Sequence, residues 1–484
     1  MASPESFVIY DLETSDRSAQ EGQIVQFASV RTDLEFNPIE EPINVLIKPN
    51  DNTLWAPEAV LVHGITPQKA LKEGLTEKEF LDFFHTKVNI GNTIFAGFNN
   101  ISFDNDFMRF INFRNYRDPY DTEYDNGNSK FDFLPAARMQ RAVRPDGIVW
   151  PFKEDGTPVN TLVSLTKANN IIHDSAHDAE SDVLGTKDLA KLLSENQKLM
   201  AYLLENRHKG KLQYFFNNNK NFLYADSRVP KDYLHVSMFT TLVALDNNTI
   251  LAYDLRHDPT EFMSLSPEQL VARMKYSKDS DLKRLPIQEI KLNKCPAVVP
   301  AAVAKEESVQ ENIKIDYAEA MSNYQKIVNA QADFTSNIIS ARDIIEKEKQ
   351  EKYAEADKKK PAEALLYSKF VSTPDKLVSD KIRRASPEEI ISLGAQLSDS
   401  RLKAMLPRYK ARNFPESLTD TERRQHNEYI RTLMLEGGEN SKFAKYKKKI
   451  GELMTAEGRT LEQNFLLNEL IIHYEATLPL YEDA

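Results

Sequence analysis

The chain has 484 residues, a hydrophobic fraction of 41%, a charged fraction of 28% and a formal net charge of −11. These values are typical of globular proteins with two or three domains, and the negative charge argues against a general nucleic-acid coat protein. No apolar run predicts a membrane span, and no signal peptide is expected at the start. The single cysteine, Cys295, excludes an internal disulfide and favours a reducing, cytoplasmic location.

Two acidic residues stand within the first apolar run, residues 7–14. The run predicts a buried strand, in which Asp11 and Glu13 point to the same face because side chains alternate. Two such carboxylates repel each other unless a cation lies between them, and hard divalent ions prefer carboxylate oxygens. For this pair alone, the alternative is an exposed strand end where water solvates both acids.

Further acidic positions follow in chain order. Asp104 comes after a second apolar run, residues 94–98, and is expected in a loop or at the start of a helix. Asp182 lies in the second turn of a helix predicted over 178–195, and His177 stands at the entry to that helix. Taken singly, His177 fits an ordinary surface or capping histidine, and Asp182 fits a solvated helix residue.

Together these residues read Asp-x-Glu, then Asp, then His-x-x-x-x-Asp, and this order resembles the DEDDh superfamily of 3′→5′ exonucleases. The resemblance implies that Asp11, Glu13, Asp104 and Asp182 hold two Mg²⁺ ions, for which Mn²⁺ can substitute, and that His177 is the general base. The residue types suit phosphodiester hydrolysis, because two ions about 3.5–4 Å apart stabilise both the attacking and the leaving oxygen. A histidine can take the proton from the attacking water near neutral pH.

Longer strings resemble bacterial exonuclease I, a family that degrades single-stranded DNA from its 3′ end. The strings are residues 26–33, 64–68, 98–104, 144–151, 165–169, 293–296 and 409–415. They cover nearly the whole chain, though thinly between about 300 and 400. One departure is Val159-Asn160-Thr161-Leu162, where the family has Ser-Phe-Arg-Leu. An arginine that can contact DNA is therefore either missing at Thr161 or replaced from elsewhere in the chain.

The resemblance implies an exodeoxyribonuclease that degrades single-stranded DNA processively to 5′-mononucleotides in DNA repair and recombination. One alternative is an RNA-trimming or proofreading exonuclease of the same superfamily, although such enzymes are usually shorter. The other is a non-catalytic DNA-binding scaffold, against which the complete set of five active-site residues argues. Discrimination between DNA and RNA depends on contacts with the 2′-hydroxyl, which the sequence does not reveal.

Changes of pattern divide the chain into three domains, of which the first is α/β. Residues 1–197 alternate apolar runs with helical stripes, which by resemblance form a ribonuclease-H-like exonuclease domain. Residues 198–345 contain short strand-like runs, including 234–239 and 240–245, where the family has a small SH3-like β-barrel. Residues 346–484 are predicted to be an α-helical domain. The resemblance implies that the last two domains surround the DNA beside the exonuclease domain. They would keep the enzyme on the strand between cleavages, which makes it processive.

Several residues outside the catalytic set are candidates for DNA contact. The stretch 207–216 mixes cations with aromatic side chains, which favours backbone contact and base stacking. The Lys-rich cluster at 442–449 fits a solvated face. His63 fits either the substrate pocket or a strand end. The predicted substrate-binding residues are Glu13, Asn100, His63, Arg109, Lys209, Lys211 and Tyr214.

A protein partner is also implied by the resemblance. Exonuclease I binds the acidic, phenylalanine-ended tail of single-stranded-DNA-binding protein. Such a tail needs a basic pocket beside an apolar one, and Arg144 and Tyr202 occupy matching positions. The alternative for Arg144 is an ordinary turn arginine after a helix. The family also implies a monomer that does not associate with membranes.

Overall fold

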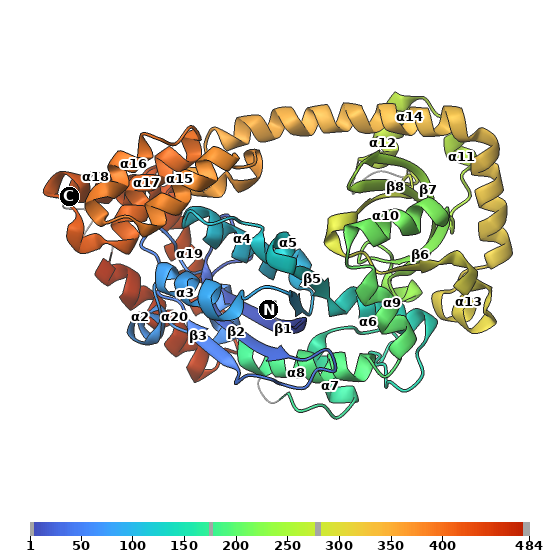
Figure 1. Cartoon of the computed structure of the whole chain (residues 1–484), viewed down its shortest axis with the longest axis horizontal. Helices are drawn as coiled ribbons and strands as arrows, with labels where there is room; N and C mark the ends of the chain where they lie inside the picture. The colour runs from blue at the N-terminus through green and yellow to red at the C-terminus, as the bar shows by residue number, and fades with distance from the viewer. Residues whose placement is uncertain (1–3, 174–177, 276–281, 478–484) are drawn as a thin grey trace.

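The computed structural model describes residues 4–173, 178–275 and 282–477. Figure 1 shows an N-terminal part from β1 to α8, a middle part from α9 to α13, and a C-terminal part from α15 to α20. The long helix α14 (Tyr317–Asp357) runs along the middle part and then crosses to the C-terminal part. The predicted boundary between residues 345 and 346 falls inside α14. Both predicted domain boundaries stay predictions.

The N-terminal part is built on a mixed five-stranded sheet in the order β3-β2-β1-β4-β5. The strands β1, β2 and β3 pair antiparallel, whereas β4 and β5 extend the sheet in parallel from β1. The strand bounds are β1 (Ser6–Thr14), β2 (Ile24–Thr32), β3 (Ile43–Leu46), β4 (Thr93–Gly97) and β5 (Ser129–Asp132).

Helices cover both faces of this sheet, as expected for an α/β layer fold. Phe7 and Ile9 of β1 pack in one core with α6 and α8, while Val8 and Tyr10 pack in another with α3 and α4. The helices are α1 (Pro57–His63), α2 (Pro67–Glu73), α3 (Glu77–Phe83), α4 (Asp104–Arg114), α5 (Asp121–Tyr124), α6 (Phe133–Val143), α7 (Leu162–Ala168) and α8 (Ala179–Leu193). The alternation along β1 therefore puts Asp11 and Glu13 on the face that α8 covers.

The middle part contains an antiparallel five-stranded sheet in the order β10-β6-β7-β8-β9. The two adjacent runs at 234–239 and 240–245 form one strand, β7, and not two. The strands are β6 (Asn221–Ala225), β7 (Val236–Asp246), β8 (Thr249–Asp254), β9 (Ile287–Lys291) and β10 (Val298–Pro300). The helices are α9 (Gln197–Glu205), α10 (Lys209–Asn218), α11 (Thr260–Met263), α12 (Pro267–Met274) and α13 (Glu307–Ile313).

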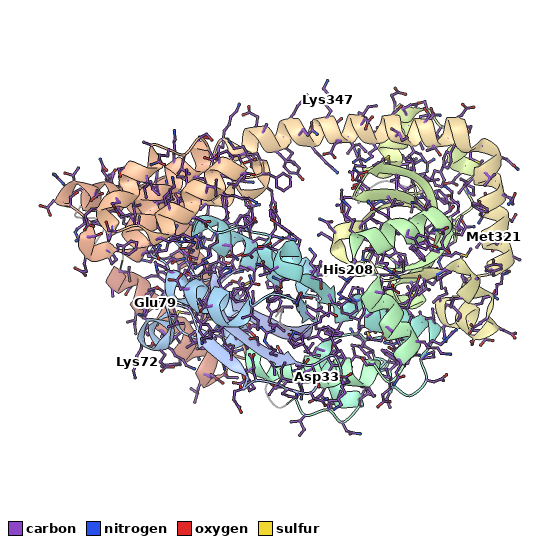
Figure 2. All side chains as sticks on the ribbon, in the orientation of Figure 1. Asp33, Lys72, Glu79, His208, Met321 and Lys347 are labelled. Carbon is purple, nitrogen blue, oxygen red and sulfur yellow. The ribbon has the colours of Figure 1, made fainter. Side chains whose placement is uncertain are left out.

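The C-terminal part is helical, as predicted. It comprises α15 (Thr373–Arg384), α16 (Pro387–Gly394), α17 (Ser400–Asn413), α18 (Asp420–Leu435), α19 (Lys442–Thr455) and α20 (Leu461–Thr477). Figure 2 shows Lys347 of α14 pointing away from the rest of the molecule where the helix crosses between the parts. No helix among the described residues is long and apolar enough to cross a membrane.

A buried ionic cluster joins the C-terminal part to the N-terminal part. Glu77 at the start of α3 is fully buried and accepts hydrogen bonds from Arg114 of α4, with Nε 2.9 Å from Oε2. Arg412 of α17 lies 3.5 Å from the same carboxylate and also pairs with Glu363. Burial by itself would raise the pKa of Glu77, but the charges of Arg114 and Arg412 outweigh it and lower the pKa to about 2. The string 409–415 therefore serves as a docking motif between the two parts.

Candidate active site at the end of the central strand

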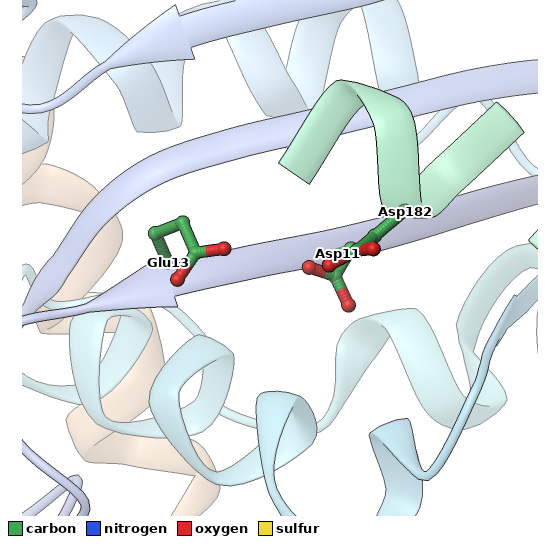
Figure 3. A group of neighbouring side chains, drawn as sticks. All are labelled: Asp11, Glu13 and Asp182. Atoms are coloured by element: carbon green, nitrogen blue, oxygen red, sulfur yellow. The ribbon is translucent and has the colours of Figure 1, made fainter. Parts of the chain in front are cut away.

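Three carboxylates converge where β1 leaves the core. Figure 3 shows Asp11 and Glu13 on β1 and Asp182 on the facing turn of α8. One oxygen from each of the three lies within 4.8 Å of the others. Burial of β1 in the middle of the sheet fixes the two strand residues, and packing of α8 on β1 and β2 brings Asp182 to them. Three of the four acids predicted as metal ligands therefore lie together, and their role in metal binding stays a prediction.

Asp104 approaches the same strand from the opposite side. It is the first residue of α4 and is 5% exposed, and its Oδ1 accepts a hydrogen bond from the backbone N–H of Leu12 at 3.2 Å. A bond from Tyr10 Oη to Asn105 Oδ1, at 2.5 Å, holds the start of α4 against β1. Among neighbouring charges, Asp104 contributes most to raising the pKa of Asp11.

The four acids make a strongly unfavourable charge cluster without a cation. Burial and then the charges of Asp104, Asp182 and Glu13 raise the pKa of Asp11 well above its usual value. Burial raises the pKa of Glu13 to about 8, and burial also raises that of Asp104 to about 7. Among the described residues, no ion pair involves Asp11, Glu13 or Asp104. An all-oxygen donor set of this kind fits hard divalent cations such as Mg²⁺.

A histidine that the sequence analysis missed contacts this cluster. The Nε2 atom of His173 lies 2.5 Å from Oδ1 of Asp182, and its Nδ1 lies 3.0 Å from Oγ1 of Thr166. Because a carboxylate only accepts hydrogen bonds, Nε2 carries the proton. His173 is almost fully buried, and the absence of a side chain at Gly185 leaves room for its ring. His177, the predicted general base, lies outside the described residues.

Of two predicted substrate residues, Asn100 is buried and His63 is partly buried. Asn100 is 1% exposed, and both polar atoms of its amide are buried without a hydrogen-bond partner among the described residues. Nδ1 of His63 accepts a hydrogen bond from the N–H of Ile65 at 3.0 Å, and burial lowers the pKa of the ring to about 4. Neutral His63 packs edge-on against Trp55. Roles for both residues in substrate binding stay predictions.

Arg109 is held by protein carboxylates. Its Nε donates to Glu123 at 2.6 Å, and its Nη1 donates to Asp106 at 2.7 Å. The guanidinium also lies over the ring of Tyr120, 5.4 Å from its centre. A phosphate would have to compete with these partners for Arg109.

The stretch 207–216 follows α9 and includes most of helix α10. Tyr214 is 70% exposed, which leaves its ring free for stacking, while Lys211 pairs with Glu205. Lys209, the first residue of α10, is also exposed. Figure 2 places His208 on the side of the middle part that faces the N-terminal part. DNA contact by this stretch stays a prediction.

The proposed partner residues lie away from the acidic cluster. Arg144 follows α6 and makes two hydrogen bonds to Glu306, from Nη1 at 2.9 Å and from Nη2 at 2.8 Å. Tyr202 of α9 is half-buried and packs against two hydrophobic cores, one shared by the N-terminal and middle parts and one within the middle part. Thr161, at the position of the missing family arginine, caps α7 by accepting a hydrogen bond from the N–H of Ser164.

A cavity of about 460 Å³ lies between the N-terminal and middle parts and was not expected from the sequence. It is lined by Asn99 and Ser102, which precede Asp104 in the sequence. The charged residues of the lining are the cations Arg138, Arg228, Lys291 and Lys294 and the carboxylates Asp132, Asp226 and Glu289, and Arg228 pairs with Asp226. Nε of Arg138 is buried without a hydrogen-bond partner among the described residues, and burial lowers the pKa of this guanidinium. The cations come from three separate segments of the chain, around Arg138, Arg228 and Lys294, so no local motif marks them.

Comparison with known proteins defines first the class and then the family. The model of the Exonuclease family matches residues 8–190, so the part that holds the acidic cluster is an exonuclease domain. The models of the Exonuclease I SH3-like domain and the Exonuclease I C-terminal domain match residues 207–341 and 360–477. This chain belongs to the bacterial exonuclease I family.

Individual relatives agree along almost the full length. Exodeoxyribonuclease I of Haemophilus influenzae is 34% identical, over 88% of this chain and 89% of the relative. The structure of exonuclease I from Methylocaldum szegediense is 31% identical, with a TM-score of 0.89, and covers 98% of this chain and 100% of that one. Escherichia coli exonuclease I in complex with a dA16 oligonucleotide is 30% identical, with the same TM-score and the same coverage. The three-domain α/β fold and the family predicted from sequence are confirmed.

Proposed function

We propose that this chain is an exodeoxyribonuclease that hydrolyses single-stranded DNA processively from the 3′ end and releases 5′-mononucleotides in DNA repair and recombination. The cluster of Asp11, Glu13 and Asp182, with Asp104 beside it, carries the proposal. The relative named exodeoxyribonuclease I and the relative described in complex with dA16 support the substrate class. The cytoplasmic location and the monomeric state also belong to this proposal.

The four acids suit two divalent ions, with Mg²⁺ the first candidate and Mn²⁺ a substitute. Asp11 would bridge them, Glu13 and Asp182 would complete one site, and Asp104 the other. Bound ions supply Lewis-acid stabilisation of the attacking and leaving oxygens. His177 acts as general base on the attacking water. His173 holds Asp182 by a hydrogen bond, which fixes the direction in which that carboxylate points.

The cavity that opens beside Asn99 and Ser102 offers a route for the rest of the strand. Arg138 and Lys294 provide cations for backbone phosphates there, and backbone contacts supply most of the affinity in sequence-independent binding. Matched labelled oligonucleotides test the substrate class: single-stranded DNA, duplex DNA, RNA, and single-stranded DNA with a blocked 3′ end. Degradation of unblocked single-stranded DNA alone is expected. Preference for RNA would favour the RNA-trimming alternative, and binding without cleavage would favour the scaffold.

The two histidines are expected to differ in their effects. His177→Ala removes the proposed base and should lower kcat by about 10²–10⁴-fold. His173→Ala removes only the support of Asp182 and should lower kcat by about 10–100-fold. Single-turnover cleavage of a labelled oligonucleotide measures both rates. A larger loss for His173→Ala would mean that His173, and not His177, is the base.

The tail of single-stranded-DNA-binding protein is expected to compete with Glu306 for Arg144. Arg144→Ala should weaken binding of a tail peptide while leaving cleavage of naked DNA unchanged. An exposed ion pair is worth about 0–1 kcal/mol, so Glu306→Gln should tighten tail binding by up to about fivefold. Fluorescence anisotropy with a labelled tail peptide measures both affinities. Unchanged binding in Arg144→Ala would place the tail elsewhere.

A further inference from the structure

Two amide side chains lie on the same sheet face as the acidic pair. In the register of the sheet, Gln26 of β2 stands opposite Glu13, and Ala28 stands between Asp11 and Asn44 of β3. Side chains of directly opposed residues share a face, so Gln26 and Asn44 point toward the helix that covers Asp11 and Glu13. This helix is α8, which packs on β1, β2 and β3.

The amides form a hydrogen-bonded chain that ends on the first turn of α8. Nε2 of Gln26 donates to Oδ1 of Asp178 at 3.1 Å and to Oδ1 of Asn44 at 2.9 Å. Nδ2 of Asn44 donates in turn to Oε2 of Glu180 at 2.8 Å. Carboxylates only accept, so Asp178 and Glu180 fix the orientation of both amides.

These amide hydrogen bonds replace the usual side-chain cap at the start of α8. Asp178 occupies the N-cap position of α8, where an aspartate normally accepts a hydrogen bond from a backbone N–H of the first turn. Its side chain makes no such capping bond, and its Oδ1 is bound to Gln26. The start of α8 is therefore hydrogen-bonded to the neighbouring strands, through Gln26 to β2 and through Asn44 to β3. Asp182 follows within the first turn, its N–H bonded to the carbonyl of Asp178 at 3.0 Å.

Gln26 is costly to keep in this position. Its side chain is 5% exposed, and its Oε1 has no hydrogen-bond partner among the described residues. A buried unsatisfied acceptor costs about 1–3 kcal/mol, which an apolar residue of the same size would avoid. Stability alone therefore does not account for a glutamine at position 26, whereas its hydrogen bond to Asp178 at the start of α8 does.

We infer that Gln26 and Asn44 are positioning residues that hold the first turn of α8 so that Asp182 meets Asp11 and Glu13. The expected loss of cleavage rate on replacing either residue rests on the proposed function. The expected loosening of the first turn of α8 rests on the hydrogen bonds alone. Loss of a residue that orients a metal ligand typically lowers metal affinity or activity by about 10–100-fold. Neither amide is proposed to contact DNA, so substrate affinity should be unchanged when either is replaced.

The test compares Gln26→Met with Gln23→Met. Gln23 is also a fully buried glutamine next to β2, but it bonds to backbone atoms of Lys48 and Asn50, away from α8. Gln26→Met should lower kcat on single-stranded DNA by about 10–100-fold with KM unchanged within about twofold. Gln23→Met should leave kcat within about twofold of the wild type, even if it unfolds at a lower temperature. Asn44→Ala, at an exposed edge position, is a second variant that should keep the fold and lower kcat by about 10-fold, at the lower end of the same range.

Two further readouts do not depend on catalysis. In Gln26→Met, backbone amides of residues 179–183 should exchange hydrogen faster than in the wild type, and Mg²⁺ should raise the unfolding temperature less. Gln23→Met should behave as the wild type in both. Unchanged exchange in Gln26→Met, or equal kcat losses in both variants, would overturn the inference. If the wild type cleaved no DNA, the proposed function would fail, while exchange and Mg²⁺ binding would still decide the positioning role.

Discussion

Asp11→Asn is expected to abolish cleavage while making the metal-free protein more stable. The substitution removes the proposed bridging carboxylate, and stabilisation by the ions is worth several kcal/mol, or about a thousandfold or more in rate. It also removes one of four like charges from a buried site, where burial and Asp104 hold the pKa of Asp11 well above its usual value. Relief of each pKa unit is worth about 1.4 kcal/mol.

The pH dependence has a definite sign. A carboxyl group whose pKa is higher in the folded protein contributes full stability below its unfolded pKa and loses it as the pH rises through the folded pKa. The pKa of Glu13 rises from 4.5 to about 8, so the metal-free wild type should lose stability across that interval. The pKa of Asp11 is raised in the same direction, and Asn does not titrate, so the advantage of Asp11→Asn over the wild type should grow as the pH rises above the unfolded pKa of Asp11, about 4.

Thermal unfolding in EDTA and in Mg²⁺ measures this effect. Mg²⁺ should stabilise the wild type, because a ligand that binds only the folded state raises its stability, and should stabilise Asp11→Asn much less. Ser29→Ala, a buried polar change on the neighbouring strand, serves as the control and should keep the response to Mg²⁺. A variant that is less stable than the wild type in EDTA at pH 8 would contradict the account of the charge cluster.

Arg412→Ala is expected to cause the largest loss of stability at a position outside the site. Arg412 joins Glu363 and the fully buried Glu77, and removing one partner of a buried ion pair costs about 3–5 kcal/mol. Because these bonds connect α17 to α3, the C-terminal part should undock from the N-terminal part. The expected result is an unfolding transition in two steps and faster proteolysis after α14.

Lys410→Ala is the matched control for Arg412→Ala. Lys410 lies on the same helix and is also buried, but its partner Glu422 belongs to the C-terminal part. This variant should unfold in one step. If the C-terminal part retains DNA, Arg412→Ala should also shorten the run length on long single strands while the cleavage rate at the first nucleotide stays near that of the wild type. An unchanged run length in an undocked variant would contradict the role of this domain in processivity.

Local sequence patterns predicted the acids of the site but not their supports. Asp11 and Glu13 follow from strand alternation, and Asp182 from a helix that begins where expected. His173 carries no spacing signal, because its contact with Asp182 depends on how the chain leaves α7. The pairing of Glu77 with Arg412, 335 residues apart, depends on how two domains pack.

The DNA-contact predictions show the same limit. Arg109 stands in a stretch rich in cations and aromatic residues, yet its guanidinium is bound by Glu123 and Asp106. Composition reveals that cations are present but not which of them lack a carboxylate partner. The cations that line the cavity beside Asn99 and Ser102 become apparent only when the middle part is placed beside the N-terminal part, and among them Arg228 pairs with Asp226.

Cleavage of a 5′-labelled single-stranded oligonucleotide in Mg²⁺ tests the central claim most directly. The wild type should produce a ladder that shortens from the 3′ end, and the ladder should be absent in EDTA and in Asp182→Asn. Asp188→Asn, at a partly exposed position on the same helix where Asp188 pairs with Lys187, should leave the ladder unchanged. Cleavage by Asp182→Asn at the rate of the wild type, or a ladder that persists in EDTA, would contradict the assignment of the acidic cluster as a metal-dependent exonuclease site.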